Sequence, residues 1–243
     1  MTVTVVSLIL LASGALTADI VEPEDCASFP CMIFEDNFDY LDNDIWEHEI
    51  TMSGGGVSLS TAEPFFRNDD FGTLGNQYGG TTLHWGPFWP YNFFEKTHAE
   101  YSANTSSFAD DFHVWRLDWT KDNMEFYVDD VLQLTIDPGN SFWDFAGMGP
   151  SFDNPWAAGD KMAPFDQKFY LILNVAVGGT NGFFPDGIAP KPWSNLSPTA
   201  FLDFWNARDE WLPSWKAGED RISEGAAMQV DYVRVWKMES TEQ

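Results

Sequence analysis

Three closely spaced segments of alternating apolar and polar residues constrain the fold of this chain more than any other feature. They lie within 112–136, read FHVWRLDWT, NMEFYV and VLQLTI, and are joined by turns at KDN and DD. A period of two is typical of β-strands, and connections this short join antiparallel neighbours. Leu132, Leu134 and Ile136 give the clearest single apolar face. The region therefore predicts an antiparallel meander, and with it an all-β fold.

Further strands are expected at both ends of the chain. CMIFE at 31–35 and IWEHEI at 45–50 lie near the start, and AMQVDYVRVW at 227–236 lies near the end. KFYLILNVAV at 168–177 is an almost continuous apolar run, which is typical of a strand covered on both faces. We expect one large β domain, because 243 residues are sufficient for a sizeable core.

One segment near 198–212 has the pattern of a short helix. Ser197 can cap it, Pro198 suits the first turn, and Pro213 ends it. We expect this helix to pack as a lid on the sheets. Its apolar residues recur at helical spacing and are Phe201, Phe204, Trp205 and Trp211.

The N-terminus has the pattern of a cleaved secretory signal peptide at 1–18. An apolar run at 3–12 is followed by small residues up to Ala18. The alternatives are a buried first strand or a membrane anchor, but the run is far shorter than the roughly 20 residues of a spanning helix. We expect a secreted protein with no membrane association after cleavage, whose mature part is a single domain at 19–243.

The two cysteines indicate a disulfide, and the charge balance restricts the classes of possible partner. Cys26 and Cys31 are the only cysteines, and after export they can form a disulfide across CASFPC. Acidic residues outnumber basic ones 38 to 12, for a net charge of -26. Repulsion of this size opposes nucleic acid or anionic lipid as a partner.

The stretch TTLHWGPFWPYNFF at 81–94 contains six aromatic rings and no charged side chain. Glycine and proline at 86, 87 and 90 prevent regular structure beyond Trp85, so a loop is expected there. Exposed rings stack well on the apolar face of a neutral pyranose. The alternative is a hydrophobic loop folded into the core. These residues alone do not decide between the two.

Five blocks along the chain, taken together, resemble a known enzyme family. They begin with FEDNFDYLDNDIWEHEITMSGGG and TLHWGPFWPYNFFEKTHAEY, and continue with FADDFHVWRLDWT, FYLILNVAVGGTNGFFPDG and VDYVRVW. In this order they resemble glycoside hydrolase family 16, in its animal β-1,3-glucanase and β-1,3-glucan-binding-protein branch. The resemblance implies a concanavalin-like jelly-roll β-sandwich whose cleft holds β-1,3-glucan. Some members hydrolyse the polymer with retention of configuration, and others bind it and signal its presence in innate immunity.

The catalytic motif of that family, E-x-D-x-x-E on one strand, is absent from this sequence. Retaining hydrolysis needs two carboxyl groups about 5 to 5.5 Å apart. The nearest match is Asp42, Asp44 and Glu47, but it lies in the family's opening turn, and Asp-Asn-Asp favours a turn. Glu47 and Glu49 share a strand face, and their position carries the same objection.

The family's catalytic strands are replaced here by the 24 residues at 57–80, so the jelly roll is expected to be incomplete. Three interpretations follow. The first is a secreted β-1,3-glucan-recognising protein without hydrolysis. The second is an active endo-1,3-β-glucanase, which requires carboxylates that the chain does not place in the cleft. The third is a shortened isoform or gene-model product that folds poorly, because missing strands expose sheet edges.

The resemblance also assigns individual residues, and it requires no cofactor. His84 and His113 match histidines of the cleft strands, where a neutral imidazole can donate and accept hydrogen bonds; without the family, each is more often a structural histidine. Asn174 is expected to reach a sugar hydroxyl, and a structural calcium is expected at Glu35 or Asp36 with Asp231. The protein is expected to be a monomer. The stacking candidates are Trp85, Trp89, Tyr91 and Trp193.

Overall fold

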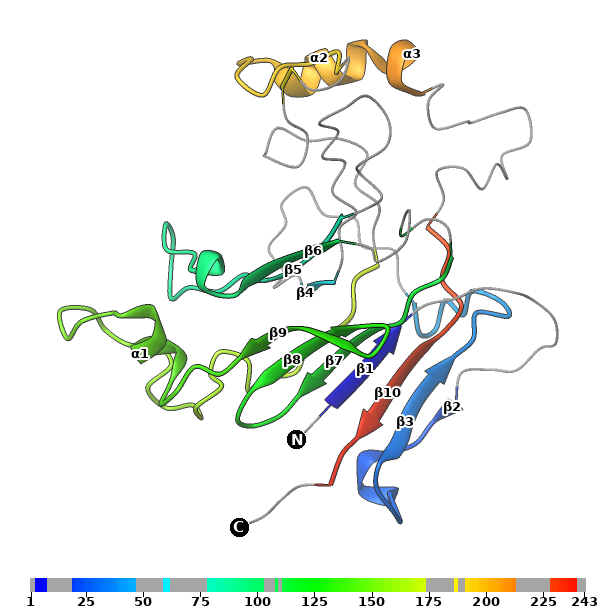
Figure 1. Ribbon diagram of the computed structural model, residues 1–243, viewed down its shortest axis with the longest axis vertical. Helices are drawn as coiled ribbons and strands as arrows, with labels where there is room; N and C mark the ends of the chain where they lie inside the picture. The colour runs from blue at the N-terminus through cyan, green and yellow to red at the C-terminus, as the bar shows by residue number, and fades with distance from the viewer. Residues whose placement is uncertain are drawn as a thin grey trace.

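The computed structural model describes residues 3–7, 19–46, 59–61, 78–102, 108, 111–173, 186–187, 191–212 and 228–239. In these ranges the chain forms ten β-strands and three short α-helices. Every described strand pair is antiparallel, which confirms the predicted all-β class (Figure 1).

Seven of the strands form the larger sheet, in the order β2-β3-β10-β1-β7-β8-β9. The predicted meander is its β7-β8-β9 edge. The DD turn places Asp129 and Asp130 at positive φ of 50° and 62°, which is the backbone of a tight two-residue hairpin. The strands are β1 (Val3–Ser7), β2 (Asp19–Ile20), β3 (Cys31–Asp36), β7 (Trp115–Trp119), β8 (Met124–Val128), β9 (Val131–Ile136) and β10 (Val233–Lys237).

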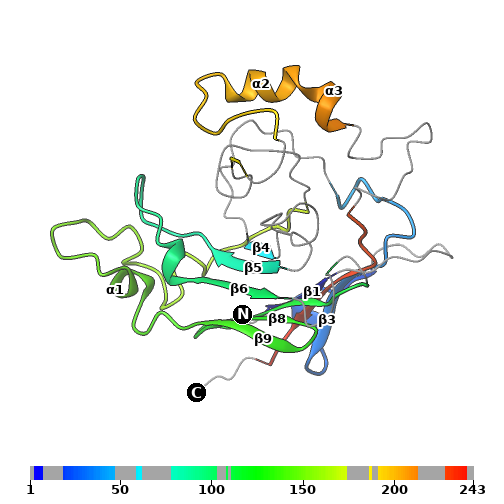
Figure 2. The same cartoon turned by 45° about the horizontal axis from the view of Figure 1, so that its top comes forward.

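The smaller sheet consists of β4 (Leu59–Thr61), β5 (Tyr78–Leu83) and β6 (His98–Ser102), in that order. It lies over the β7-β9 end of the larger sheet (Figure 2), as expected for a β-sandwich. The core lies between the two, because the buried faces of their strands meet there. Its buried members are Leu83, Trp85, Leu117, Met124, Phe126, Ile136, Phe142, Met162 and Phe165.

A short helix, α1 (Phe142–Ala146), closes one side of this core. Ser141 caps its N-terminus by accepting a hydrogen bond from the backbone N–H of Asp144. Gly147 ends it with φ of 74°, a conformation that glycine adopts without strain. The helix thereby delivers Phe142, which is fully buried, against Trp85 and Phe165.

The expected apolar face of β9 is interrupted. Ile136 is 2% exposed, but Leu132 is 48% exposed. The reason is a register shift in which Phe126 pairs with Leu134 and Tyr127 pairs with Leu132. Opposed residues share a face, and Tyr127 belongs to the outer face of β8 because Phe126 points inward. This bulge turns Leu132 outward.

The predicted helix near 198–212 is confirmed, but its predicted role as a lid is not supported. The segment forms α2 (Ala200–Asn206) and α3 (Arg208–Trp211), which lie apart from both sheets (Figures 1 and 2). Phe204 stacks on Trp211 at 4.6 Å, whereas Phe201 is 83% exposed. The helical period is therefore correct, but half of the apolar stripe faces outward.

Other strand predictions hold only in part. Residues 168–173 of the long apolar run are described and are not in a strand, and Tyr170 is 70% exposed. Residues 45–46 end a turn, and 47–50 lie outside the described residues. The predicted last strand begins only at Val233, because 228–232 take no regular structure.

The N-terminal residues pair inside the larger sheet. Val3–Ser7 form β1 between β10 and β7, which is the first-strand alternative to a signal peptide. Cleavage at 18 stays a prediction.

The Cys26–Cys31 disulfide is confirmed, with an S–S distance of 2.02 Å. No helix in the described ranges is long and apolar enough to span a membrane.

Candidate carbohydrate-contact surface

The aromatic stretch forms a loop that is tied at its base. The loop leaves β5 after Leu83 and returns to β6, and the backbone N–H of Leu83 donates to the carbonyl of Thr97. The indole Nε1 of Trp85 donates to Thr97 Oγ1 at 2.9 Å, and this hydroxyl in turn donates to the Leu83 carbonyl at 2.8 Å. A further backbone bond joins Phe93 N to Trp85 O. These bonds fix both ends of the loop.

Trp85 belongs to the core, so its assignment as a stacking platform is not supported. It is 4% exposed. One face of its ring stacks on Phe145, at 5.5 Å and an interplanar angle of 4°. Phe93, Phe142 and Trp156 pack around the remainder of the ring. The hydrophobic-loop alternative is thus correct for the base of the loop.

The tip of the same loop faces outward. Trp89 is 91% exposed, and Phe88 and Tyr91 are 44% and 38% exposed. Gly86 makes this reversal feasible, because a Cβ there would collide with the Tyr91 carbonyl oxygen. The tip is therefore a local projection carried on a buried base.

A fourth ring, missed from the sequence, joins these three. Phe152, in the loop after α1, is 42% exposed and contacts both Phe88 and Tyr91, at 6.2 and 5.9 Å between ring centroids. Its setting, GMGPSFDNP, is a turn-rich loop like that of Trp89, and this was the available signal. We call Phe88, Trp89, Tyr91 and Phe152 the aromatic tip.

Polar groups lie beside the tip. His84 Nδ1 is 3.0 Å from Asn92 Nδ2, and the His84 ring leans on Phe94 at 5.4 Å. Asn92 is exposed and was not singled out in the sequence. An imidazole and an amide can each donate and accept hydrogen bonds, as recognition of sugar hydroxyls requires. The role of His84 as a partner of sugar hydroxyls stays a prediction.

His113 does not join this group. Its Nδ1 is 2.6 Å from Oδ2 of Asp129, which lies in the turn between β8 and β9. Its ring meets the edge of Phe108 at 5.0 Å, and its buried Nε2 has no hydrogen-bond partner among the described residues. The described contacts of His113 include none with the aromatic tip. Asn174 lies outside the described residues.

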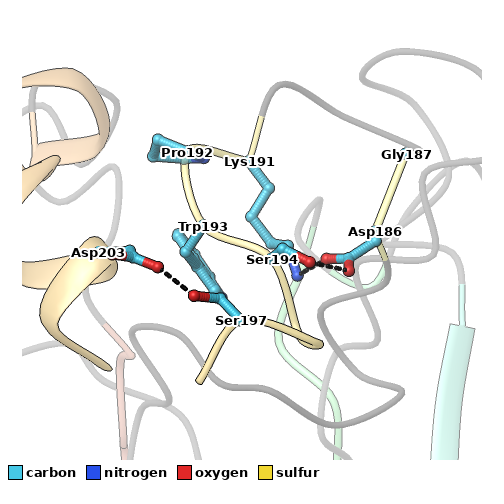
Figure 3. Close-up of a pocket in the computed structure, with 8 residues that line it drawn as sticks. All are labelled: Asp186, Gly187, Lys191, Pro192, Trp193, Ser194, Ser197 and Asp203. Carbon is cyan, nitrogen blue, oxygen red and sulfur yellow. Dashed lines mark hydrogen bonds and ion pairs between the residues drawn. The ribbon is translucent and has the colours of Figure 1, made fainter. Parts of the chain in front are cut away.

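Trp193 lines a separate shallow hollow of about 580 Å³ (Figure 3). It is 9% exposed, packs edge-on against Phe204 at 5.0 Å, and has the Lys191 ammonium 5.2 Å from its ring centroid. Lys191 also pairs with Asp186, and this bond, with the Ser194 hydroxyl, holds the Asp186 pKa below its usual range. Bonds within the protein therefore occupy these groups, and the ring offers little free surface.

The nearest match to a catalytic trio forms a turn, as predicted. Asp42 Oδ1 accepts from the backbone N–H of Asp44 at 2.9 Å, and the Asp42 carbonyl accepts from Trp46 N. Glu47 lies outside the described residues. The carboxylate of Asp42 is thus engaged with its own backbone in an Asx-type turn.

Glu35 and Asp36, which are expected to bind calcium, are bonded to other groups of the protein, and the calcium site stays a prediction. Glu35 pairs with Arg234, and Asp36 accepts from Phe38 N at 2.8 Å and from Trp46 Nε1 at 2.6 Å. These two neighbours on β3 serve different partners, on opposite faces of the strand. The described residues, among them Asp231, contain no group of three His, Cys, Asp or Glu side chains that could bind a metal ion.

Comparison with known proteins identifies relatives of this chain. The model for glycosyl hydrolases family 16 matches residues 69–160. A β-1,3-glucan-binding protein of Penaeus monodon is 61% identical over 362 residues, covering 98% of this chain and 99% of the relative. Gram-negative bacteria-binding protein 1 of Drosophila melanogaster is 40% identical over 54% of this chain and 24% of its own length. β-1,3-Glucan-binding protein 2 of Manduca sexta is 36% identical over 55% of this chain and 26% of its own length. No solved structure matches.

The chain is markedly shorter than the Penaeus monodon relative. Their alignment extends over 362 positions and the chain has 243 residues, so at least 119 positions have no residue here. This difference agrees with the expected replacement of several strands by a short segment. Because the alignment nevertheless reaches almost the whole of that relative, the chain belongs to glycoside hydrolase family 16, in the animal branch that includes the β-1,3-glucan-binding proteins.

Proposed function

We propose that this chain is a secreted protein that binds β-1,3-glucan without hydrolysing it, and that the aromatic tip contacts the sugar. The names of the Penaeus monodon and Manduca sexta relatives support the choice of ligand. The excess of acidic over basic residues opposes an anionic ligand and is compatible with a neutral one. The tip supplies flat apolar surface, and His84 with Asn92 supplies polar groups beside it.

The observation that carries this proposal is the exposure of Trp89. An indole that is 91% exposed leaves a large apolar area in water, and burying such an area is favourable. The loop base is anchored in the core, which limits the backbone entropy that the loop loses when a ligand covers the tip. Exposed rings on an anchored loop are suited to stacking on sugar.

The absence of hydrolysis is proposed because the E-x-D-x-x-E motif is missing and its nearest match is a turn. Stacking on rings stabilises substrate and transition state alike, so it supports binding rather than rate. A retaining mechanism also needs an acid and a nucleophile that face one another.

Calorimetric titration with laminarin, a soluble β-1,3-glucan, tests the proposal. Trp89→Ala removes one stacking surface and is expected to lower affinity roughly tenfold, which corresponds to about 1.4 kcal/mol. Phe201→Ala is the matched control, because Phe201 is 83% exposed but lies on α2, away from the sheets. It is expected to bind like the wild type.

Two outcomes contradict the proposal. Equal loss of affinity in both variants indicates a nonspecific effect of apolar surface. If the folded Trp89→Ala protein binds laminarin with the same affinity as the wild type, the tip is not the contact surface. Melting curves for all three proteins establish that each is folded.

A further inference from the structure

The position between β7 and β10 is filled by the N-terminal strand of the chain. β1 pairs with β10 from Val3↔Lys237 to Ser7↔Val233, and with β7 from Val3↔Trp119 to Ser7↔Trp115. It is therefore an interior strand, with a ladder on each edge (Figure 1). The same residues lie in the segment that the sequence predicts to be cleaved. A mature chain without them has two facing strand edges with no strand between.

The neighbours of this position show which kind of side chain fits its inward-facing side. Val5 is level with Leu117 on β7 and with Val235 on β10. Leu117 is 3% exposed, and Val233, two residues before Val235 on the same face, is 1% exposed. Because directly opposed residues share a face, the Val5 position belongs to the core side of the sheet. It calls for an apolar residue.

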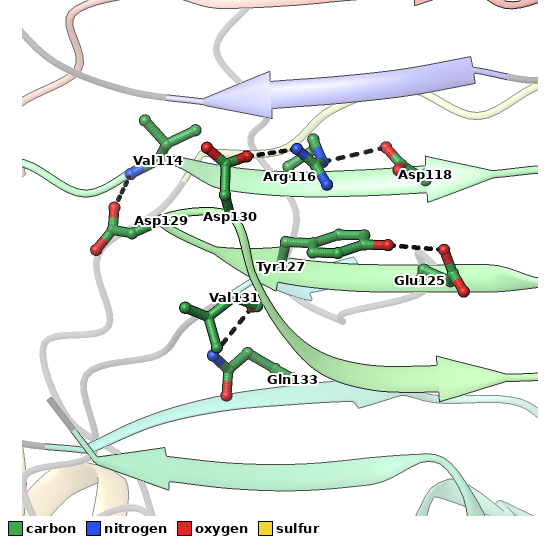
Figure 4. Close-up of polar contacts among 9 residues, drawn as sticks. All are labelled: Val114, Arg116, Asp118, Glu125, Tyr127, Asp129, Asp130, Val131 and Gln133. Atoms are coloured by element: carbon green, nitrogen blue, oxygen red, sulfur yellow. Dashed lines mark hydrogen bonds and ion pairs between the residues drawn. The ribbon is translucent and has the colours of Figure 1, made fainter. Parts of the chain in front are cut away.

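On the outward face of the sheet, the charges of the neighbouring residues determine which side chain is favoured. The Val6 position is level with Arg116 on β7 and with Arg234 on β10. Two guanidinium groups therefore flank it, and that of Arg234 is paired with Glu35. Figure 4 shows Arg116 with its partners Asp118 and Asp130 on the face beside β1. Opposite charges on adjacent strands attract, so an acidic residue suits this position better than valine.

The charge preference reverses two residues earlier. Thr4 is level with Asp118 on β7 and with Trp236 on β10. A basic residue there faces a carboxylate on one side and an aromatic ring on the other, and both attract a cation. The two outward positions of the site therefore select opposite charges.

We propose that the position between β7 and β10 is a strand-binding site, which Val3–Ser7 fills in the uncleaved chain. Removal of residues 1–18 opens it to an extended peptide that has an apolar residue at the Val5 position and an acidic one at the Val6 position. Unpaired strand edges are templates for such pairing, and the backbone ladders supply affinity while the alternate side chains supply selectivity.

The uncleaved chain, produced without a secretion step, tests the register. Val6→Glu is expected to melt about 2 °C or more above Val6→Lys, because it faces Arg116 and Arg234. At Thr4 the order is expected to reverse, with Thr4→Lys melting above Thr4→Glu. A general effect of the -26 charge favours lysine at both positions, so it cannot produce this crossover. Identical melting of all four variants overturns the placement of β1.

The secreted chain, as cells export it, tests the opening. Mass spectrometry first identifies its N-terminus, and a chain that retains residues 1–18 overturns the cleavage step. A synthetic peptide of residues 1–9 is then added, and hydrogen exchange is followed at the amides of Leu117 and Arg234, whose backbone groups point toward β1. We expect the peptide to protect them, and its Val6→Glu version to bind on the order of threefold more tightly than its Val6→Lys version. Amides that are protected before peptide addition show that another segment fills the position, and contradict the proposal.

Discussion

The indole N–H of Trp85 donates a hydrogen bond to Thr97 Oγ1, 2.9 Å away, and this bond ties together the two ends of the loop that presents Trp89. Thr97 is fully buried, and its hydroxyl also donates to the Leu83 carbonyl. One side-chain oxygen thus serves an indole N–H and a backbone carbonyl that are both shielded from water. The base of the loop is rigid because each of these polar groups has a partner.

Replacing Thr97 by Val is expected to lower the free energy of unfolding by about 1–3 kcal/mol, since the buried Trp85 N–H loses its acceptor while the side-chain shape is kept. Chemical denaturation measures this change. Thr135→Val, at an exposed position of β9, is the control and should be close to neutral. Equal stability of the two variants would show that the Trp85–Thr97 bond contributes nothing.

Affinity for laminarin is expected to be nearly independent of ionic strength, in spite of the net charge of -26. The glucan carries no charge, so screening removes no attraction between the partners. Titrations at about 0.05 M and about 0.5 M salt should agree within about twofold. A strong fall in affinity with salt points to a charged ligand and argues against a neutral sugar.

Purified protein is expected to release no reducing ends from laminarin above background, because the paired carboxyl groups of a retaining glycosidase are missing. The Asp44→Asn variant is the informative companion, since Asp44 belongs to the nearest match to the motif and sits in an exposed turn. Turnover in the wild type that Asp44→Asn abolishes would restore the enzyme interpretation.

Stability is expected to fall as pH rises through the range in which Tyr101 ionises. Burial raises the pKa of Tyr101 from 10.0 to about 12, and a hydrogen bond with Thr81 opposes this only in part. Below the unfolded pKa near 10 the folded state keeps its full stability. Between about pH 10 and pH 12 the unfolded chain loses the proton more readily than the folded chain. The free energy of unfolding therefore falls, by an amount that approaches about 2 to 3 kcal/mol.

Melting temperatures of the wild type and Tyr101→Phe, measured from about pH 8 to about pH 11.5, test this linkage. The variant should lose less stability over that range, because phenylalanine does not ionise. Titration of the tyrosinate absorbance should show one late-ionising group fewer in the variant than in the wild type. Parallel pH profiles for the two proteins contradict the assignment to Tyr101.

Much of this molecule follows from short-range sequence pattern. The meander with its two turns, the Cys26–Cys31 disulfide and the Asp42 turn were all predicted, and each depends on residues close together in the chain. The lack of a catalytic motif is likewise a property of the sequence itself. Local backbone preference and loop closure over few residues are sufficient for such features.

Only the tertiary structure decided which residues of each pattern are buried. Trp85 and Trp89 stand four residues apart in one uncharged stretch, yet one is 4% and the other 91% exposed, because α1 and the 156–165 loop cover only the base. A bulge opposite Tyr127 turns Leu132 outward, and the register of β1 sets Val6 between two arginines. Burial is determined by the elements that pack on a residue from distant parts of the chain, and periodicity carries no record of those partners.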